Sequence, residues 1–242
     1  MALAGKNVQV LVAGYDLTGD SNKLMMNDSR NIHDVTAFGD GVHKFIVGPR
    51  VVALSHAGYL NSAAAASHPV LKSAAVQGVV SALLGQNANP AVGDPAFSLY
   101  AQQGQYTSAE EFAEYVPFSA AFANAGSLGG WGVALAVPVT FTNTSNGAGV
   151  NNGAASSNGG TAFLHVLQAA ASDTYSIIVE GSTTGAFAGE QTTLVTFSLN
   201  ASVLGSDYKA LSGTIPQYTR WKATRTGSVG NTVKIAVTLV RF

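Results

Sequence analysis

Residues 232–242 read TVKIAVTLVRF, and this stretch carries the clearest fold signal in the chain. Its side chains alternate between two faces, with Val233, Ile235, Val237 and Leu239 on one and Lys234, Ala236 and Thr238 on the other. Alternation with a period of two residues is typical of a β-strand that places one face in a core. The stretch therefore predicts a strand and a β-sheet around it.

Further strand candidates recur at regular spacing before this stretch. They cover residues 162–168, 174–180, 192–199 and 218–225, with Gly, Ser and Asn turns between them. About five strands is a usual size for one sheet. We expect residues 162–242 to form a β-sandwich-like module.

The first half of the chain also favours strands. Candidates lie at residues 8–12, 23–30, 45–47, 50–59, 97–101, 116–124 and 131–143. Residues 142–161 are nearly all Asn, Ser, Thr, Gly or Ala, which offer too little apolar surface to order strongly. We expect a first β domain over residues 1–141, a linker or long loop over residues 142–161, and the second module after it.

One segment favours a helix instead of a strand. Within residues 68–84, apolar side chains recur at helical spacing at Val76, Val79, Val80, Leu83 and Leu84. Ser67 stands at the N-cap position, Pro69 follows early, and Gly85 lies just past the end. The predicted fold is thus mainly β: an antiparallel sandwich or barrel with one packed α-helix, plus the second β-sandwich-like module.

The composition points to assembly with partners. Hydrophobic residues make up 47% of the chain and charged residues only 10%, against roughly a quarter in soluble proteins. A surface with so few charges lacks the repulsion that keeps monomers apart, so we expect much of it to be covered. The net charge of −1 gives no basic footprint for nucleic acid, and no apolar run is long enough to span a membrane.

The residue types that usually carry chemistry are sparse. The chain has no cysteine, and none of its five histidines pairs with another at metal-ligand spacing. Asp16, Asp20, Asp34 and Asp40 could bind calcium, but hydrogen bonding in turns explains them better. Neither a phosphate-binding glycine loop nor a nucleophile elbow is found. We therefore expect no catalytic residue, no cofactor and no metal.

Aromatic side chains leave one alternative open. Trp131, Tyr175, Phe187, Tyr218 and Trp221 could line a carbohydrate platform, which would make the chain a glycan-binding module. Aromatic residues on strands more often fill a core, and this second interpretation is favoured.

The opening third contains two short motifs, AGYDLTGDSN at residues 13–22 and DVTAFGD at residues 34–40. Residues 45–48 and a strand ending at Gly58 and Tyr59 follow them. With these motifs the sequence resembles the bacteriophage tail tube, or major tail protein, family. The likeness extends through roughly the first half of the chain, and the motifs are not catalytic ones.

The resemblance implies a virion structural protein that assembles with itself and with other tail proteins. Members of such families build stacked rings, whose joined strands form a barrel through which DNA passes without specific binding. The ring would be a hexamer, or a trimer of two-module subunits, in a virion tail assembled in the host cytoplasm, with no membrane involved. The second module exceeds a minimal tube subunit, so a capsid decoration or minor tail role stays open.

Four residues are candidates for the assembly surface: Asp34, Phe38, Asp40 and Pro49. They lie in and beside the family-like turn between two strands. If Phe38 lies in an interface, Phe38→Asp blocks oligomer formation and leaves the β structure intact. If Phe38 fills the core, the same change buries an unpaired charge and unfolds the monomer.

Overall fold

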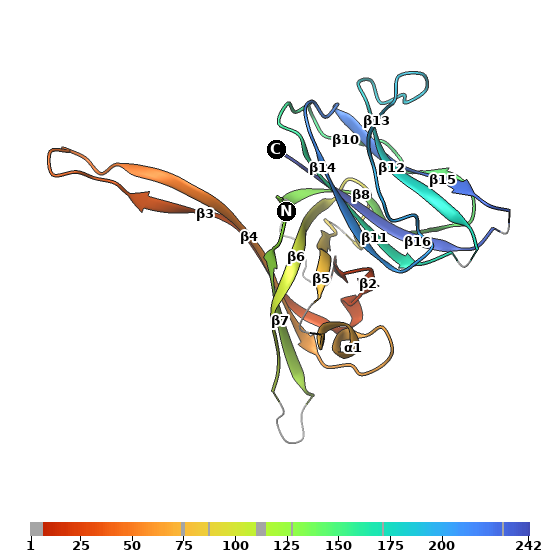
Figure 1. Ribbon diagram of the computed structural model, residues 1–242, viewed down its shortest axis with the longest axis horizontal. Coiled ribbons are helices and arrows are strands. Elements are labelled where there is room, and N and C mark those ends of the chain that lie inside the picture. The colour runs from red at the N-terminus through yellow and green to blue at the C-terminus, as the bar shows by residue number, and fades with distance from the viewer. Residues whose placement is uncertain are drawn as a thin grey trace.

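In the computed structural model of the chain, nearly all of the regular secondary structure is antiparallel strands (Figure 1). It describes residues 7–242 apart from residues 74–75, 87, 110–114, 127, 171 and 229. Within this part of the chain, eleven strands form one large sheet and five form a smaller one. The predicted mainly β fold with antiparallel pairing and a helix is confirmed.

The large sheet is built from strands of both halves of the sequence. Its main path runs β14 (Gly205–Leu211), β11 (Gly160–Gln168), β16 (Val233–Arg241), β8 (Gly130–Phe141), β6 (Pro95–Ser108), β5 (Gln77–Leu84), β1 (Val8–Val12) and β2 (Tyr15–Asp16). The predicted strand at residues 232–242 is therefore confirmed as β16. It lies between β11 and β8 and is buried on both faces, because Ala236 and Thr238 are covered as well as Val237.

Strand β6 is where the large sheet divides. One edge of β6 pairs with β5. The other edge pairs with β8 over Pro95 to Ser98 and with β7 (Pro117–Asn124) from Ala101 onward. From β7 the sheet continues through β4 (Phe45–Tyr59) to β3 (Ser21–Asp34). Strands β1, β3, β4, β5, β6 and β7 thus surround one apolar core, whose largest members include Phe97, Leu99 and Phe122.

The smaller sheet contains β9 (Ser145–Asn146), β10 (Val150–Asn151), β12 (Thr174–Ser182), β13 (Thr192–Thr196) and β15 (Tyr218–Thr226). It packs on the large sheet through a second core, in which Ile177 and Trp221 meet Leu164 and Val237. The expected sandwich-like packing of the second half is therefore present. The domain boundaries at residues 141 and 162 stay a prediction, since β8 and β16 pair directly.

The predicted helix over residues 68–84 is wrong in most of its length. The helix α1 spans only Ser67–Leu71, and residues 77–84 form strand β5. Both faces of β5 are covered, so Val79 and Val80 are buried on opposite sides. A continuous apolar run of this kind fits a buried strand as well as a helix, and its spacing alone cannot separate the two.

The expected linker over residues 142–161 is ordered. It supplies β9 and β10, which both pair with β15, and Ser156 forms a bridge with Ile215. Val150 is buried in the second core. Backbone pairing with β15 and the hydrogen bonds from Asn152 Nδ2 to Gln217 O and Thr219 Oγ1 hold this segment in place. Elsewhere in the described residues, no helix has the length and apolarity needed to cross a bilayer.

Candidate self-assembly surface on a projecting hairpin

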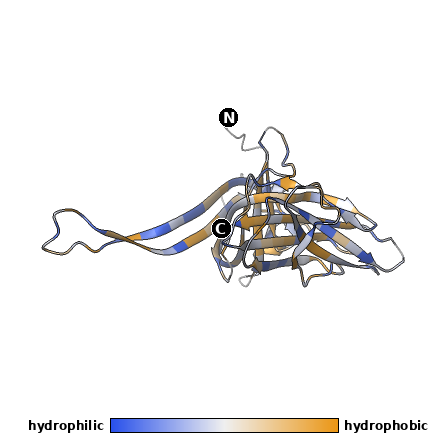
Figure 2. Cartoon of the chain, turned by 90° about the horizontal axis from the view of Figure 1, so that it is seen from above, coloured by the Kyte–Doolittle hydropathy of each residue, from blue (hydrophilic) through white to orange (hydrophobic). Residues whose placement is uncertain are grey.

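A long hairpin leaves the body of the molecule. Strands β3 and β4 pair along their whole length, from Ser21 opposite Gly58 to Asp34 opposite Phe45. Strand β7 supports β4 only between Ala53 and Tyr59. The far part therefore projects as an isolated two-stranded ribbon (Figures 1 and 2). We call residues 31–49 the arm, and none of them is buried.

The arm is unusually apolar for a fully exposed segment. Phe38 at its tip is 115% exposed. Its other exposed large apolar side chains are Ile32, Val35, Val42, Phe45, Ile46 and Val47. Monomeric proteins rarely leave such a contiguous patch in water, and a lone two-stranded hairpin is marginally stable. Both features indicate that another molecule covers the arm.

One face of β3 leads from the core out into solvent. Leu24 and Met26 pack against the core of the first half. Side chains two residues apart share a face of a strand, so Ile32 continues the face of Leu24 and Met26. Val47 stands directly opposite Ile32 and extends this face onto β4. By this alternation the face of Leu24 and Met26 passes through the charged residues Asp28 and Arg30 and becomes apolar again on the arm.

An ion pair fixes the arm where it leaves the body. Arg50 donates from Nε and Nη2 to the two carboxylate oxygens of Asp28, at 2.7 and 2.6 Å. These hydrogen bonds lower the pKa of Asp28 and raise that of Arg50. The pair packs on Gly130, where an added Cβ would lie 2.3 Å from Arg50 Nη2, and Arg50 lies over the ring of Phe242.

Removing this ion pair should loosen the arm. Arg50→Ala leaves the partly buried Asp28 carboxylate without its guanidinium partner, so we expect a loss of about 1–3 kcal/mol in the free energy of unfolding. Urea denaturation measures this loss, and hydrogen exchange should rise at the base of β3 and β4. Lys44→Ala is the control, because Lys44 pairs with Asp40 at the exposed tip. An unchanged exchange rate in Arg50→Ala would contradict the anchoring role.

The structure places all four predicted assembly residues on the arm. Asp34 accepts hydrogen bonds from the backbone N–H and hydroxyl of Thr36, which lower its pKa. Asp40 accepts from the backbone N–H of Ala37 and from Lys44, and the lysine is the larger cause of its lowered pKa. Both carboxylates thus shape the tip that carries Phe38. Their role in assembly stays a prediction.

Pro49 lies in an irregularity of β4. The pairing shifts between Arg30–Arg50 and Ile32–Val47, so Gly48 and Pro49 face a single residue of β3. A bulge of this kind accommodates proline, which has no N–H to donate. Pro49 therefore bends the arm without leaving a donor unpaired.

Several apolar arm residues were not among the predicted assembly residues, chiefly Ile32, Phe45, Ile46 and Val47. The stretch at residues 45–47 was predicted as a strand, which is confirmed. The apolar composition of this strand could not show that it is exposed to solvent, because a buried strand has the same composition. The exposure of this strand follows from the pairing of β4 with β7, which stops at Ala53.

The four aspartates considered for calcium do not gather at one place. Asp16 and Asp20 lie at the base of β3, and Asp34 and Asp40 lie at the opposite end of the hairpin. Asp16 accepts from the N–H and hydroxyl of Thr18, as expected of a turn residue. Across the described residues, no three His, Asp or Glu side chains are arranged to hold a metal ion.

A buried Ser–His pair lies between the two halves of the molecule. His165 Nδ1 accepts from the Gly14 N–H at 3.4 Å, so Nε2 carries the proton and donates to Ser81 Oγ at 2.9 Å. Burial lowers the pKa of His165 to about 3. In this tautomer the ring cannot take a proton from Ser81, and both side chains are sealed from solvent. The pair is a structural contact and has no arrangement for nucleophilic catalysis.

Most of the aromatic residues considered for carbohydrate binding lie in the core. Tyr175, Phe187 and Trp221 are buried, which confirms the interpretation as core residues for these three. Trp131 is 47% exposed, with its ring edge-on to Phe97. One exposed ring does not make the platform that the alternative requires.

Comparisons with known proteins give structural likenesses only. No protein-family model matches the sequence, and no curated protein matches it. Solved structures that it resembles include chains of gene transfer agent particles and a phage Dit protein. A chain from the virion of a native gene transfer agent particle is 15% identical, with a TM-score of 0.41, over 53% of this chain and 98% of that one.

Two further structures give similar values. A chain from the tail of an empty gene transfer agent particle with C6 symmetry is 15% identical, with a TM-score of 0.38, over 52% of this chain and 96% of that one. The Dit protein of phage SPP1, described as a paradigm of the hub adsorption apparatus, is 11% identical, with a TM-score of 0.36, over 97% and 99%. At these identities and TM-scores the likeness carries no argument about function.

Proposed function

We propose that this chain is a structural subunit of a bacteriophage tail, which assembles with copies of itself into rings that stack as a tail tube around DNA. The observation that supports the proposal most is the arm. It exposes apolar side chains on a ribbon without neighbours. Such a segment is stable when another subunit covers it.

The tail assignment draws on the resemblance of two motifs to tail tube proteins. In the structure these motifs stand at the two ends of β3. Residues 13–22 form the turn before β3, and residues 34–40 form the tip after it. Gly14 in the first motif has φ +91°, and an added Cβ would lie 2.7 Å from Gly205 Cα. The family-like residues therefore build the base and the tip of the same projecting hairpin.

The proposal is tested by the size of the purified protein. The full chain should form rings or tubes in negative-stain images and a multimer in size-exclusion chromatography with light scattering. A chain that stays monomeric at high concentration, and forms no ring or filament, would overturn the proposal.

Phe38→Asp should weaken assembly without unfolding the chain. Because Phe38 is fully exposed, the substitution buries no charge in the monomer. Losing one apolar contact of this size and placing a charge in the interface costs about 2–3 kcal/mol, which raises the dissociation constant roughly 30- to 150-fold. Light scattering over a concentration series measures the change. Val203→Asp, an exposed position on the body, should assemble as the unmodified chain does.

A further inference from the structure

The strands around the first core form a circuit with one gap. Strand β1 pairs with β5, β5 with β6, β6 with β7, β7 with β4, and β4 with β3. Among the described strands, no pairing joins β3 back to β1. The core of the first half is therefore open along one seam.

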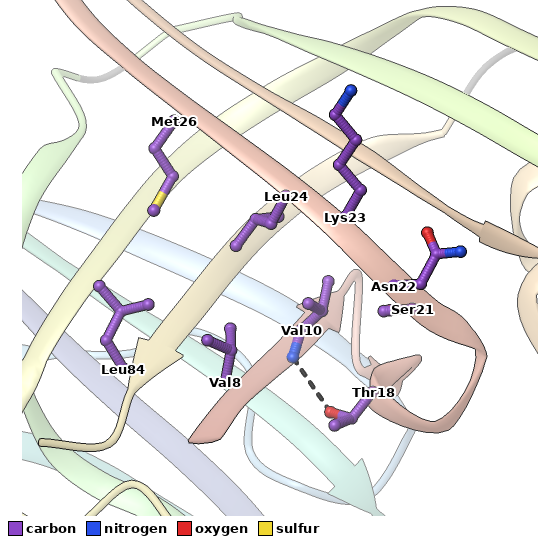
Figure 3. Close-up of a pocket in the computed structure, with 9 residues that line it drawn as sticks. All are labelled: Val8, Val10, Thr18, Ser21, Asn22, Lys23, Leu24, Met26 and Leu84. Atoms are coloured by element: carbon purple, nitrogen blue, oxygen red, sulfur yellow. Dashed lines mark hydrogen bonds between the residues drawn. The ribbon is translucent and has the colours of Figure 1, made fainter. Parts of the chain in front are cut away.

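A groove of about 430 Å³ lies at this seam. Figure 3 shows side chains from its two walls pointing toward one another, Val8 and Val10 from β1 and Leu24 and Met26 from β3. Val8, Leu24 and Met26 pack against the core but are only partly covered. One end is closed where the Val10 N–H donates to Thr18 Oγ1 at 3.0 Å. The groove has the apolar lining that one face of an added strand would cover.

The backbone at the seam also lacks a partner. In the described part of the chain, β3 pairs with β4 alone, so no strand pairs with its other edge; at the start of β3 the Ser21 N–H bonds to Thr18 O. Strand β4 has a free outer edge from the arm to residue 52, because β7 begins to pair at Ala53. Two free strand edges with apolar side chains are a ready template for pairing between chains.

The arm of the same chain cannot fill its own groove. Strand β3 runs from the groove wall at Leu24 into the arm at Ile32 without interruption. Folding the arm back would break the ladder between β3 and β4 at the Asp28–Arg50 anchor. The arm of another copy can fill the groove instead. Its exposed side chains Phe45 and Val47 lie two residues apart on β4, so they share one face and match the apolar side chains of the groove.

We propose that the groove between β1 and β3 receives the arm of a second copy, whose strand β4 adds to the free edge of β3. This proposal rests on the proposed self-assembly and names its receptor surface. Phe45 and Val47 of the incoming arm then cover Leu24, Met26 and Val8. Because groove and arm are different surfaces, the contact is head-to-tail, and repetition closes a ring or extends a filament.

A complementation experiment with the full chain tests the receptor. The groove variant is Met26→Lys, whose aliphatic stem can lie along the core while its ammonium group blocks the groove. The arm variant is Phe45→Asp with Val47→Asp. Each alone should be monomeric by native mass spectrometry, with the far-UV circular dichroism of the unmodified chain and a cooperative thermal transition; its melting temperature should be lower only by the stability that assembly adds. Mixed in equal amounts, they should form a dimer and nothing larger, since only one intact groove can meet one intact arm.

The outcomes separate the two proposals. A groove variant that assembles as the unmodified chain does, or a mixture that stays monomeric, would overturn the groove as receptor while leaving self-assembly in place. An unmodified chain that is monomeric at high concentration would remove both proposals.

Cross-linking covers the case in which Met26→Lys fails to fold. The chain has no cysteine, so Val8→Cys in one preparation and Val47→Cys in another are unique sites. A short bismaleimide should link the two chains in their mixed assembly. Val203→Cys in place of Val47→Cys is the matched control and should give no linked dimer with Val8→Cys. Equal yields from Val47→Cys and Val203→Cys would overturn the proposal.

Discussion

A chain with a shortened arm is expected to fold fully and to remain monomeric. The change replaces residues 31–49 by Asn-Gly, the two-residue turn that suits a tight hairpin. It keeps the Arg30–Arg50 pair and the Asp28–Arg50 anchor at the base. None of the removed residues is buried, so no core contact is lost and the shortened chain should keep a cooperative thermal transition.

The effect on assembly should be large because the arm carries seven exposed large apolar side chains. Covering one such side chain contributes about 1.5–3 kcal/mol before the costs of association. Even a net loss of about 4 kcal/mol raises the dissociation constant roughly a thousandfold. Analytical ultracentrifugation should show a single monomer species where the unmodified chain is multimeric. Multimers of unchanged size from the shortened chain would show that assembly does not need the arm.

Strand β16, in the middle of the large sheet, was predictable from local pattern. The alternation at residues 232–239 gave β16 because its two faces differ enough in polarity to be seen. The face of Ala236 and Thr238 is nevertheless buried. The Thr238 hydroxyl is accommodated there by a hydrogen bond with the Ser98 hydroxyl, at 2.7 Å. From sequence, a small or hydroxyl-bearing side chain is predicted to face solvent. In the core its hydroxyl can instead form a hydrogen bond with a residue far away in the sequence.

The helix predicted over residues 68–84 is wrong, and the short strands inside the expected linker or loop were not predicted, because distant strands decide the structure of both segments. Residues 77–84 form β5 because β1 and β6 lie on either side of them, and no local feature reports those neighbours. Residues 145–151 are ordered by β15, which follows them by more than sixty residues. Of the arm, only the turn at its tip was predictable, because Asp34 and Asp40 are typical turn residues. The exposure of Phe45 and Val47 depends on where the pairing with β7 ends, which the sequence does not show.

Acid is expected to destabilise the fold well before its carboxylates titrate. His165 and His56 are buried, and burial lowers their pKa values to about 3 and about 4. The unfolded chain, with histidine pKa values of about 6.5, binds more protons than the folded chain below that pH. The stability that neutral histidine provides is thus fully present above about pH 6.5 and is lost progressively as pH falls toward the folded values.

The loss is steep because both rings are held neutral by their surroundings. Protonating His165 would place a charge in the buried interior. It would also put a hydrogen on Nδ1, which now accepts from the Gly14 N–H, so that two donors would face each other. Each histidine then contributes up to about 1.4 kcal/mol of lost stability per pH unit. Urea unfolding at pH 7, 6 and 5 should show a free energy of unfolding that falls at each step.

A substitution that removes one titrating group should flatten this dependence. His165→Gln should be less stable than the unmodified chain at pH 7, by about 1–3 kcal/mol, because Ser81 and Gly14 lose a matched partner. Its stability should then fall less between pH 7 and pH 5, with His56 as the remaining buried histidine. His43→Gln is the control, since it removes a histidine at the exposed arm tip and leaves both buried rings in place. If His165→Gln kept the full slope, the acid sensitivity would have to arise from groups other than this junction between Gly14 and β11.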